Sequence, residues 1–236
     1  MFNFFLKKYY RLLGSKKILK LFYLYHKIFG EKYVGNLDLD FSKKKGRAEI
    51  IQNIIDLKDF KSYLEIGTYK NEVFDKIKCK KKIGVDPVSG GNIRMTSDNF
   101  FKVNQDKFDI IFIDGLHTYK QVKKDILNSI NFLRDGGVIL LHDCLPLNYY
   151  SNAVPRCTYV WSGDVWKAFV EMRTKDDLDC YCCYADQGIG VILKRKNQNQ
   201  LTIKFKKFSD IKFNYYFDNY KKLMCLKEYN EIIKLL

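Results

Sequence analysis

The chain has 236 residues, of which 47% are hydrophobic and 29% are charged, a length that predicts one large domain with appendages. Its 18 Phe and 17 Tyr supply a core-building composition, which excludes a wholly disordered chain. The formal net charge of +15 raises nucleic acid or an anionic membrane as a partner. Only seven of the 42 basic residues are arginine, the residue better suited to base and phosphate recognition, so nucleic acid is not the expected partner.

The seven cysteines are an odd number and include no CxxC pair, which argues against a disulfide framework and a zinc ribbon. We therefore expect reduced thiols in a cytosolic protein. Cys180, Cys182 and Cys183 lie in a strand-like run, where small buried hydrophobic residues are the favoured interpretation.

Residues 1–30 contain six Lys, one Arg and no acidic residue, interleaved with aromatic residues. The lysines interrupt every apolar stretch, so the sequence predicts neither a signal peptide nor a membrane-spanning helix. Two interpretations stay open for this segment. It forms a basic amphipathic helix that lies on a membrane or a partner, or, as we favour, a helical cap whose Phe and Leu side chains face the core.

Residues 1–60 are predicted to be mostly helical. Apolar runs then alternate with a helical pattern, which is typical of βαβ units and a parallel sheet. The predicted strands are Tyr63–Gly67, Lys82–Asp86, Phe108–Asp114 and Gly137–Asp143, and the predicted helix is Thr118–Phe132, closed by residues 135–137. The last three strands are nearly continuous apolar runs that end in Asp, as expected for strands buried on both faces.

Asp179–Tyr184 and Gly190–Lys194 are predicted to be two further strands, joined by a short turn and therefore antiparallel. Residues 197–236 combine the strand-like sequence LTIKFKKF with an aromatic, lysine-rich tail. We expect three parts: a basic helical extension over 1–60, a central domain over 61–196, and a C-terminal extension over 197–236 that packs on the same domain.

Ligands of open α/β sheets bind beyond the carboxyl ends of the strands. Asp86 follows Gly67 by 19 residues, the spacing at which a carboxylate accepts the ribose hydroxyls of a cofactor. A dinucleotide also requires a glycine-rich loop for its pyrophosphate, but Glu65 and a single glycine stand there instead. A carboxylate repels pyrophosphate and suits a cationic cofactor, which points to S-adenosylmethionine rather than NAD.

Four segments carry a family resemblance: LEIG at 64–67, VDP at 85–87, IDGLHTYKQV at 113–122 and GGVILLHDCLP at 136–146. Over roughly residues 60–195 the chain resembles class I S-adenosylmethionine-dependent methyltransferases. More narrowly, it is similar to bacterial O-methyltransferases of sugar, surface-polysaccharide and natural-product pathways. The resemblance implies an α/β, Rossmann-like seven-stranded methyltransferase sheet, mostly parallel with an antiparallel last strand and with helices on both faces.

The resemblance also implies which residues bind the cofactor. Glu65 and Gly67 would line its methionine side, Asp86 would hold the ribose hydroxyls, and Ser97 and Asp98 would contact the adenine. The chain departs from the family pattern because no further glycine follows Gly67 in this loop.

The acceptor chemistry is expected at the next two strand ends. His117 is the best candidate for the general base, since the ordinary pKa of histidine lies near 6.5, and His142 is a second catalytic candidate. Asp114, also a cofactor-binding candidate, and Asp143 are candidates to hold Mg²⁺ or another divalent cation. Metal-dependent catechol-type O-methyltransferases, which this pattern resembles, follow the second carboxylate with an amide ligand. Here Cys144, a poor Mg²⁺ ligand, stands there, so a bound metal stays open.

Structural roles are alternatives for the same residues. Asp114 is also suited to capping the helix that starts near Thr118, and His142 to being a core histidine. Trp161 could form an aromatic platform for an acceptor, or it could be structural. For Trp166 we favour a place in the core.

These observations predict an S-adenosylmethionine-dependent O-methyltransferase that acts on a hydroxyl of a sugar, nucleotide sugar or related small molecule. We expect a cytoplasmic protein, with peripheral contact at the inner face of the membrane through residues 1–30 and homo-oligomers as two further options. One alternative is an RNA methyltransferase, suggested by the charge, although the chain has no recognisable RNA-binding module. Another is a catalytically inactive Rossmann-like adaptor that docks through its basic N-terminus.

Overall fold

The computed structural model describes residues 15–236, so expectations for residues 1–14 lie outside it. The helices are α2 (Lys16–Phe29), α3 (Arg47–Lys58), α4 (Ser97–Val103), α5 (Tyr119–Phe132), α6 (Tyr149–Asn152), α7 (Val165–Met172), α8 (Phe213–Met224) and α9 (Tyr229–Leu235), with single 3-10 turns at Phe74–Lys76 and Phe208–Asp210. The strands are β1 (Ser62–Ile66), β2 (Lys81–Val85), β3 (Phe108–Ile113), β4 (Leu133–Leu141), β5 (Leu178–Cys183), β6 (Ile189–Lys194) and β7 (Leu226–Lys227).

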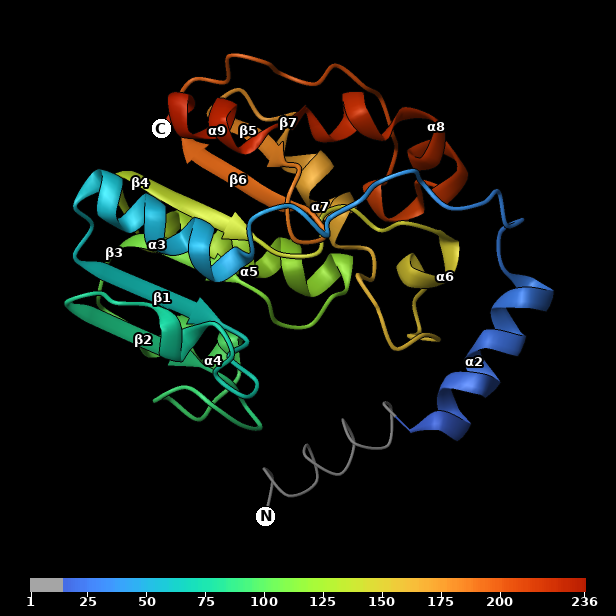
Figure 1. Cartoon of the computed structure of the whole chain (residues 1–236), viewed down its shortest axis with the longest axis horizontal. Coiled ribbons are helices and arrows are strands. Elements are labelled where there is room, and N and C mark those ends of the chain that lie inside the picture. Colours follow the sequence, from blue (N-terminus) through green and yellow to red (C-terminus); the bar gives the residue numbers. More distant parts are fainter. Residues whose placement is uncertain (1–14) are drawn as a thin grey trace.

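One seven-stranded sheet forms the centre of the molecule, in the order β2-β1-β3-β4-β6-β5-β7 (Figure 1). β2, β1, β3 and β4 are parallel, whereas β6 runs antiparallel to both of its neighbours. The predicted mostly parallel sheet with an antiparallel strand is confirmed. The antiparallel strand is β6, however, and a short strand, β7, follows it in the chain and pairs in parallel with β5. Beyond β2, one isolated parallel bridge joins Val85 to Ile93.

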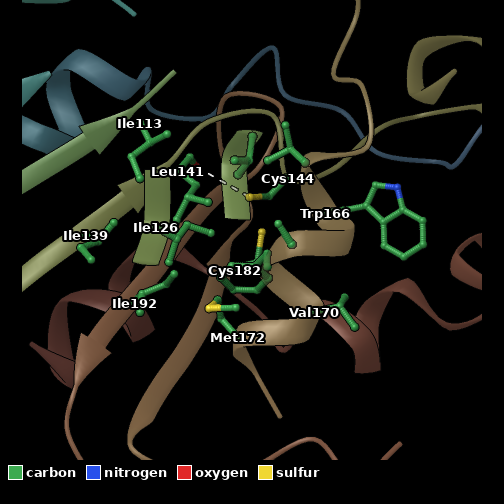
Figure 2. Packing of buried hydrophobic residues seen from close by; sticks show 14 of the residues in the cluster. Ile113, Ile126, Ile139, Leu141, Cys144, Trp166, Val170, Met172, Cys182 and Ile192 are labelled. Carbon is green, nitrogen blue, oxygen red and sulfur yellow. Dashed lines mark hydrogen bonds between the residues drawn. The ribbon is translucent and has the colours of Figure 1, made fainter. Parts of the chain in front are cut away.

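Helices cover both faces of the sheet because alternate side chains of each strand point to opposite faces. On one face, Leu64 and Ile111 belong to a core cluster with residues of α4, α5, α7 and α8. On the other face, Tyr63 and Ile110 belong to a cluster with α3 and α9. Figure 2 shows the first cluster, in which Cys182 lies among Ile, Val and Met side chains.

All seven cysteines are free. The three of the strand-like run, Cys180, Cys182 and Cys183, lie in β5 and are buried, as predicted. Among the described residues no helix is both long and apolar enough to cross a membrane.

One secondary-structure prediction holds in part and another is wrong. Residues 30–46 are not helical: the segment begins after Gly30, passes through Gly35 at φ 114°, and lies over the domain with a hydrogen bond from Leu37 N to Leu147 O at 2.8 Å. The LTIKFKKF segment forms no strand over residues 201–207. Its apolar residues pack against the core instead, and β7 occupies the sheet edge beside β5.

The residues expected to close the helix after Phe132 belong to a strand. α5 ends at Phe132 as predicted, but β4 begins at the next residue, four residues earlier than expected, and includes residues 135–137. The pairing of β4 with β3 shifts register between Phe108 and Ile110, so this glycine-containing stretch forms an irregular start to the strand.

Candidate active site

Two neighbouring strands bring acidic residues together at the carboxyl end of the sheet. Asp114 directly follows β3, and Asp143 follows β4 by two residues. The pairing continues past both strands, because Asp114 N donates to Ile66 O at 2.8 Å and His142 N donates to Ile113 O at 3.0 Å. Asp143 has a positive φ of 60°, which is uncommon for a residue other than glycine. The predicted juxtaposition of these strand ends is therefore present.

His117 lies between the two carboxylates. Its Nε2 is 3.2 Å from Asp114 Oδ1, and its Nδ1 is 3.2 Å from Asp143 Oδ2. Nδ1 also faces the carbonyl oxygen of Trp161 at 2.9 Å. The ligand atoms of the three residues lie within 4.8 Å of one another, close enough to bind one cation together.

His142 joins the same carboxylates rather than lying alone in the core. Its Nδ1 is 3.1 Å from Asp143 Oδ2 and 3.3 Å from Asp114 Oδ1. Its Nε2 is 3.3 Å from Asp186 Oδ1. The His142 side chain itself is only 6% exposed, whereas Asp114 and Asp186 are partly exposed.

Two residues complete the group without having been predicted. The Arg47 guanidinium lies 3.2 Å from Asp186 Oδ1 and 3.6 Å from Asp114 Oδ2, and Arg47 N donates to Asp186 Oδ2 at 2.6 Å. Asp186 was visible as an acid in the turn of the predicted antiparallel pair, whereas no local pattern marked Arg47. We call the whole group the histidine–aspartate cluster: Arg47, Asp114, His117, His142, Asp143 and Asp186.

The charges of the histidine–aspartate cluster stabilise one another. Burial would raise the pKa of Asp114, but His142 and His117 outweigh it and hold that pKa below its usual range. Burial likewise opposes ionisation of Asp186, yet the hydrogen bond from His142 lowers its pKa to about 2. Burial would lower the pKa of both histidines, and the facing aspartates raise both instead. The facing aspartates therefore favour the protonated form of both imidazoles, and only the neutral form of His117 can act as a base.

An aromatic loop closes the cluster on the side of His117. The Trp161 indole stacks on the His117 ring, with centroids 5.3 Å apart and planes 22° apart, and its Nε1 donates to Ala153 O at 2.7 Å. Gly163 has a φ of 61°, and a Cβ there would overlap the carbonyl oxygen of His117. Only glycine allows this close approach.

Trp166 has the predicted structural role. Its side chain is fully buried, and its Nε1 donates to Asn152 Oδ1 at 2.6 Å. Trp166 lies in the hydrophobic core cluster drawn in Figure 2. Trp161, in contrast, lies beside His117 at the histidine–aspartate cluster.

Glu65 and Gly67 lie at the end of β1, next to the strand that carries Asp114. Gly67 has a φ of 89°, and a Cβ there would overlap the Asp114 backbone, which explains the glycine at this position. Glu65 is buried and accepts a hydrogen bond from the Tyr63 hydroxyl. Burial raises the pKa of Glu65 to about 7, although that hydrogen bond opposes the shift.

Asp86 closes the loop that follows β2. Its Oδ1 accepts from Val88 N at 2.7 Å and from Ser89 N at 2.8 Å, and its Oδ2 accepts from Tyr69 N at 3.0 Å. A carboxylate has about four acceptor positions, so one position on Oδ2 is left for a ribose hydroxyl. The carboxylate thus fits the predicted role, which stays a prediction.

Ser97 and Asp98 lie outside the histidine–aspartate cluster, in the first turn of α4. Gln121 Nε2 lies 3.3 Å from Ser97 Oγ and 3.1 Å from Asp98 Oδ1. Lys124 Nζ lies 2.5 Å from Asp98 Oδ2. These contacts join the two residues to α5, and their contact with adenine stays a prediction.

Cys144 is directed away from the cluster, although it follows Asp143. It is fully buried in the core, and Figure 2 shows its sulfur near the Leu141 carbonyl, 3.8 Å away. The ligand set that the structure offers a cation is therefore two carboxylates and an imidazole. Carboxylates suit Mg²⁺ and Mn²⁺, and the imidazole favours the transition metals, so the residues fit a divalent cation.

The sheet order and its antiparallel strand define the Rossmann-like fold of class I methyltransferases. The family described as a methyltransferase domain matches residues 76–144, the segment that contains β2, β3, β4 and four residues of the cluster. Over this segment the chain is similar to a methyltransferase domain.

Several solved structures are similar to the chain. SAH-bound PaMTH1, a methyltransferase from Podospora anserina, is 12% identical with a TM-score of 0.48, over 64% of this chain and 78% of that one. An O-methyltransferase from Bacillus cereus in complex with SAH is 11% identical with a TM-score of 0.47, over 80% and 97%. The O-methyltransferase TomG from Streptomyces achromogenes, in complex with SAM, is 11% identical with a TM-score of 0.48, over 80% and 96%. No curated protein sequence matches the chain significantly.

Proposed function

We propose that the chain is an S-adenosylmethionine-dependent O-methyltransferase whose acceptor is a hydroxyl of a sugar, nucleotide sugar or related small molecule. The observation that carries this proposal is the position of His117, between Asp114 and Asp143 at the carboxyl end of the sheet. A base, two carboxylates and an aromatic side chain in one partly exposed group are the components that deprotonation and alignment of a hydroxyl require.

The cofactor assignment rests on charge. Glu65 stands where a dinucleotide site would have a glycine-rich phosphate loop, and Asp86 retains an acceptor position for a ribose hydroxyl. S-adenosylmethionine, when bound, supplies a methyl group on a positively charged sulfur. A buried carboxyl at the end of β1 favours such a cation once it is ionised.

The reaction that these residues support is an in-line displacement. His117, once neutral, accepts the proton of the acceptor hydroxyl at a ring nitrogen. The acceptor oxygen forms the new bond to the methyl carbon, and the bond from that carbon to sulfur breaks with its electron pair kept by sulfur. Asp143 and Asp114 stabilise the imidazolium that results, since both raise the pKa of His117.

Trp161 supports a sugar-like acceptor. Its indole stacks on His117, and aromatic faces pack well on sugar rings. We place the acceptor hydroxyl next to His117, with the ring of the acceptor against the aromatic loop. A place in polysaccharide biosynthesis, within the cytoplasm, agrees with this chemistry and with the seven free thiols.

Cation assistance is the second part of the proposal. Asp114 and Asp143 would hold Mg²⁺ or another divalent cation, which lowers the pKa of a bound hydroxyl when present. The imidazole of His117 would act as the base rather than as a third ligand. The variant His117→Asn separates the two roles: cation binding survives if His117 is the base and weakens strongly if it is a ligand.

The cofactor proposal is tested by calorimetric titration of the full chain with SAH (S-adenosylhomocysteine), with NAD as the control ligand. We expect micromolar binding of SAH and none of NAD. Absence of SAH binding, with and without Mg²⁺, would overturn the proposal and leave the inactive adaptor as the leading interpretation.

The metal proposal is tested by titration with Mn²⁺ alone. We expect binding to the unaltered chain and to Asp218→Asn, a surface change on α8, and none to Asp143→Asn. Equal binding by both variants would place the cation elsewhere.

The domain boundaries expected from the sequence, with the central domain over 61–196, form part of the same proposal.

A further inference from the structure

The helix α2 contacts the domain through one of its faces. Leu19 and His26 are buried there, at 4% and 5% exposure. His26 Nε2 lies 2.8 Å from Pro155 O and its Nδ1 lies 3.2 Å from the Tyr149 hydroxyl. Tyr23 packs on Tyr150, with ring centroids 4.5 Å apart. The helix is thus held in a fixed orientation beside α6.

The opposite face of α2 is apolar and exposed. Its large side chains expose between 50% and 73% of their surface, and we call this group the outer stripe: Leu21, Leu24, Tyr25, Ile28 and Phe29. The first four recur at spacings of three and four residues, which places them on one side of a helix. Contiguous exposed apolar surface of this kind is uncommon on soluble proteins and marks an interaction site.

The charge of α2 is uniformly positive. Its 14 residues include Lys16, Lys17, Lys20 and Lys27 and no acidic residue, and all four lysines are exposed. At 100° per residue, Lys16, Lys20 and Lys27 lie along one side of the helix, next to the outer stripe. An apolar stripe bordered by lysines has the pattern of helices that lie in a membrane interface.

We propose that the outer stripe of α2 docks on a membrane surface rich in anionic lipid, with the helix axis parallel to the bilayer. The lysines would contact lipid phosphates and carboxylates, while the apolar side chains enter the boundary of the acyl chains. A second copy of the chain fits less well, because two such helices repel each other through their lysines. At roughly 1.5 Å per residue, a 14-residue helix is also too short to cross a bilayer, so it lies on the surface.

Figure 1 shows α2 at the edge of the molecule, with the sheet and its helices on one side of it. Because α2 is fixed to the Tyr149 and Pro155 region, docking would also fix the orientation of the whole domain at the membrane. The inference depends on the surface alone and is independent of the proposed reaction.

The test uses the full chain and co-sedimentation with vesicles. Vesicles of phosphatidylcholine alone are compared with vesicles that also contain phosphatidylserine. We expect binding to the anionic vesicles, weakened by salt because charged contacts are screened, and little binding to the neutral ones. Replacement of Lys16, Lys20 and Lys27 by Gln should weaken the binding by about fivefold for each lysine.

The apolar part of the contact is tested by the double variant Leu24→Asp and Ile28→Asp. Both side chains are exposed, so the fold is retained, and affinity for anionic vesicles should fall by at least about tenfold. The matched control is Val103→Asp with Val160→Asp, at side chains 68% and 62% exposed, the first on α4 and the second in the loop before Trp161. This control should bind as the unaltered chain does.

Two outcomes would overturn the proposal. One is equal vesicle binding by the Leu24→Asp, Ile28→Asp variant and the unaltered chain, which would place the contact elsewhere. The other is absence of binding to anionic vesicles at low salt. If the unaltered chain does not bind anionic vesicles but forms a dimer, and the Leu24→Asp, Ile28→Asp variant does not form that dimer, the outer stripe is an interface between two copies of the chain instead.

Discussion

Nε2 of His142 lies 3.3 Å from Oδ1 of Asp186, and this contact joins the end of β4 to the turn between β5 and β6. The turn is strained, because Asp186 and Gln187 both have positive φ values, of 39° and 60°. Conformations of this kind persist where the surrounding contacts compensate for their cost. His142 and Arg47 provide those contacts, so the turn depends on the histidine–aspartate cluster as much as the cluster depends on the turn.

Asp186→Asn should therefore lower stability strongly. The substitution removes the carboxylate that contacts both His142 and Arg47, and breaking one partner of a buried ion network costs about 3 kcal/mol. The free energy of unfolding is measured by urea denaturation, with Asp218→Asn as the control. A loss no larger than that of the control would show that Asp186 does not stabilise His142.

Gly163→Ala should disturb the contact between the aromatic loop and His117. A Cβ at Gly163 would overlap the His117 carbonyl at a φ of 61°, so the loop has to move, at a cost of about 3 kcal/mol or more. Gly136→Ala is the matched control, because φ is also positive there, at 74°, but nothing lies within 4 Å of the added Cβ. That control should lose only about 1 kcal/mol. Equal losses of unfolding free energy would mean that the close approach is unimportant.

The affinity for S-adenosylmethionine should rise with pH if Glu65 faces the cofactor. Burial raises the pKa of Glu65 to about 7, so the carboxyl is mostly neutral at pH 5.5 and mostly ionised at pH 7.5. The ionised form attracts a cationic cofactor, and we expect an affinity gain of about tenfold across this range. Calorimetric titrations at both pH values measure it.

Glu65→Gln is the control for this dependence, since the amide is neutral at every pH. The variant should bind with similar, weak affinity at both pH values. A pH dependence that the variant retains would assign the effect to another group.

Asp125 should make the unfolding free energy of the domain fall as pH rises. An ion-paired carboxylate has the opposite effect, because its pKa is lowered in the folded state. It lies on α5, 1% exposed, with Gln121 Nε2 3.1 Å from its Oδ1. Burial raises its pKa from 3.8 to about 6. Because the folded pKa is the higher one, the stabilising contribution is complete below pH 4 and is lost as pH rises through 6.

Asp125→Asn removes this titration. From pH 4 to pH 7.5 the unfolding free energy of the original chain should fall, relative to that of the variant, by about 3 kcal/mol. Urea denaturation of both proteins at each pH gives the difference. A constant difference across the range would contradict the prediction.

The sequence predicted the parts of the site that local pattern determines. Asp114 and Asp143 end continuous apolar runs, and parallel pairing of those runs places them side by side. His117 and His142 follow from the same strand ends. Arg47 could not be predicted, since its role depends on where α3 begins relative to a turn 139 residues later in the chain.

The wrong strand prediction for residues 201–208 has a physical cause. The LTIKFKKF segment alternates as a strand does, but a strand also requires a partner with free backbone groups. β7 pairs with β5 at that side of the sheet, and Ile203 and Phe205 pack against the core. An alternating pattern of apolar and polar residues does not show which strand of the sheet has backbone groups free for pairing.

The distance along the chain between Arg47 and Asp186 has a consequence for biosynthesis. These two residues contact each other across 139 positions, and the strands that carry the other cluster residues are translated between them. A nascent chain that has reached Asp143 already contains the four cluster residues that follow β3 and β4, but it lacks Asp186, the carboxylate that contacts both Arg47 and His142. The cluster is therefore complete only after the turn following β5 leaves the ribosome, and a chain interrupted before that turn lacks one of its three carboxylates.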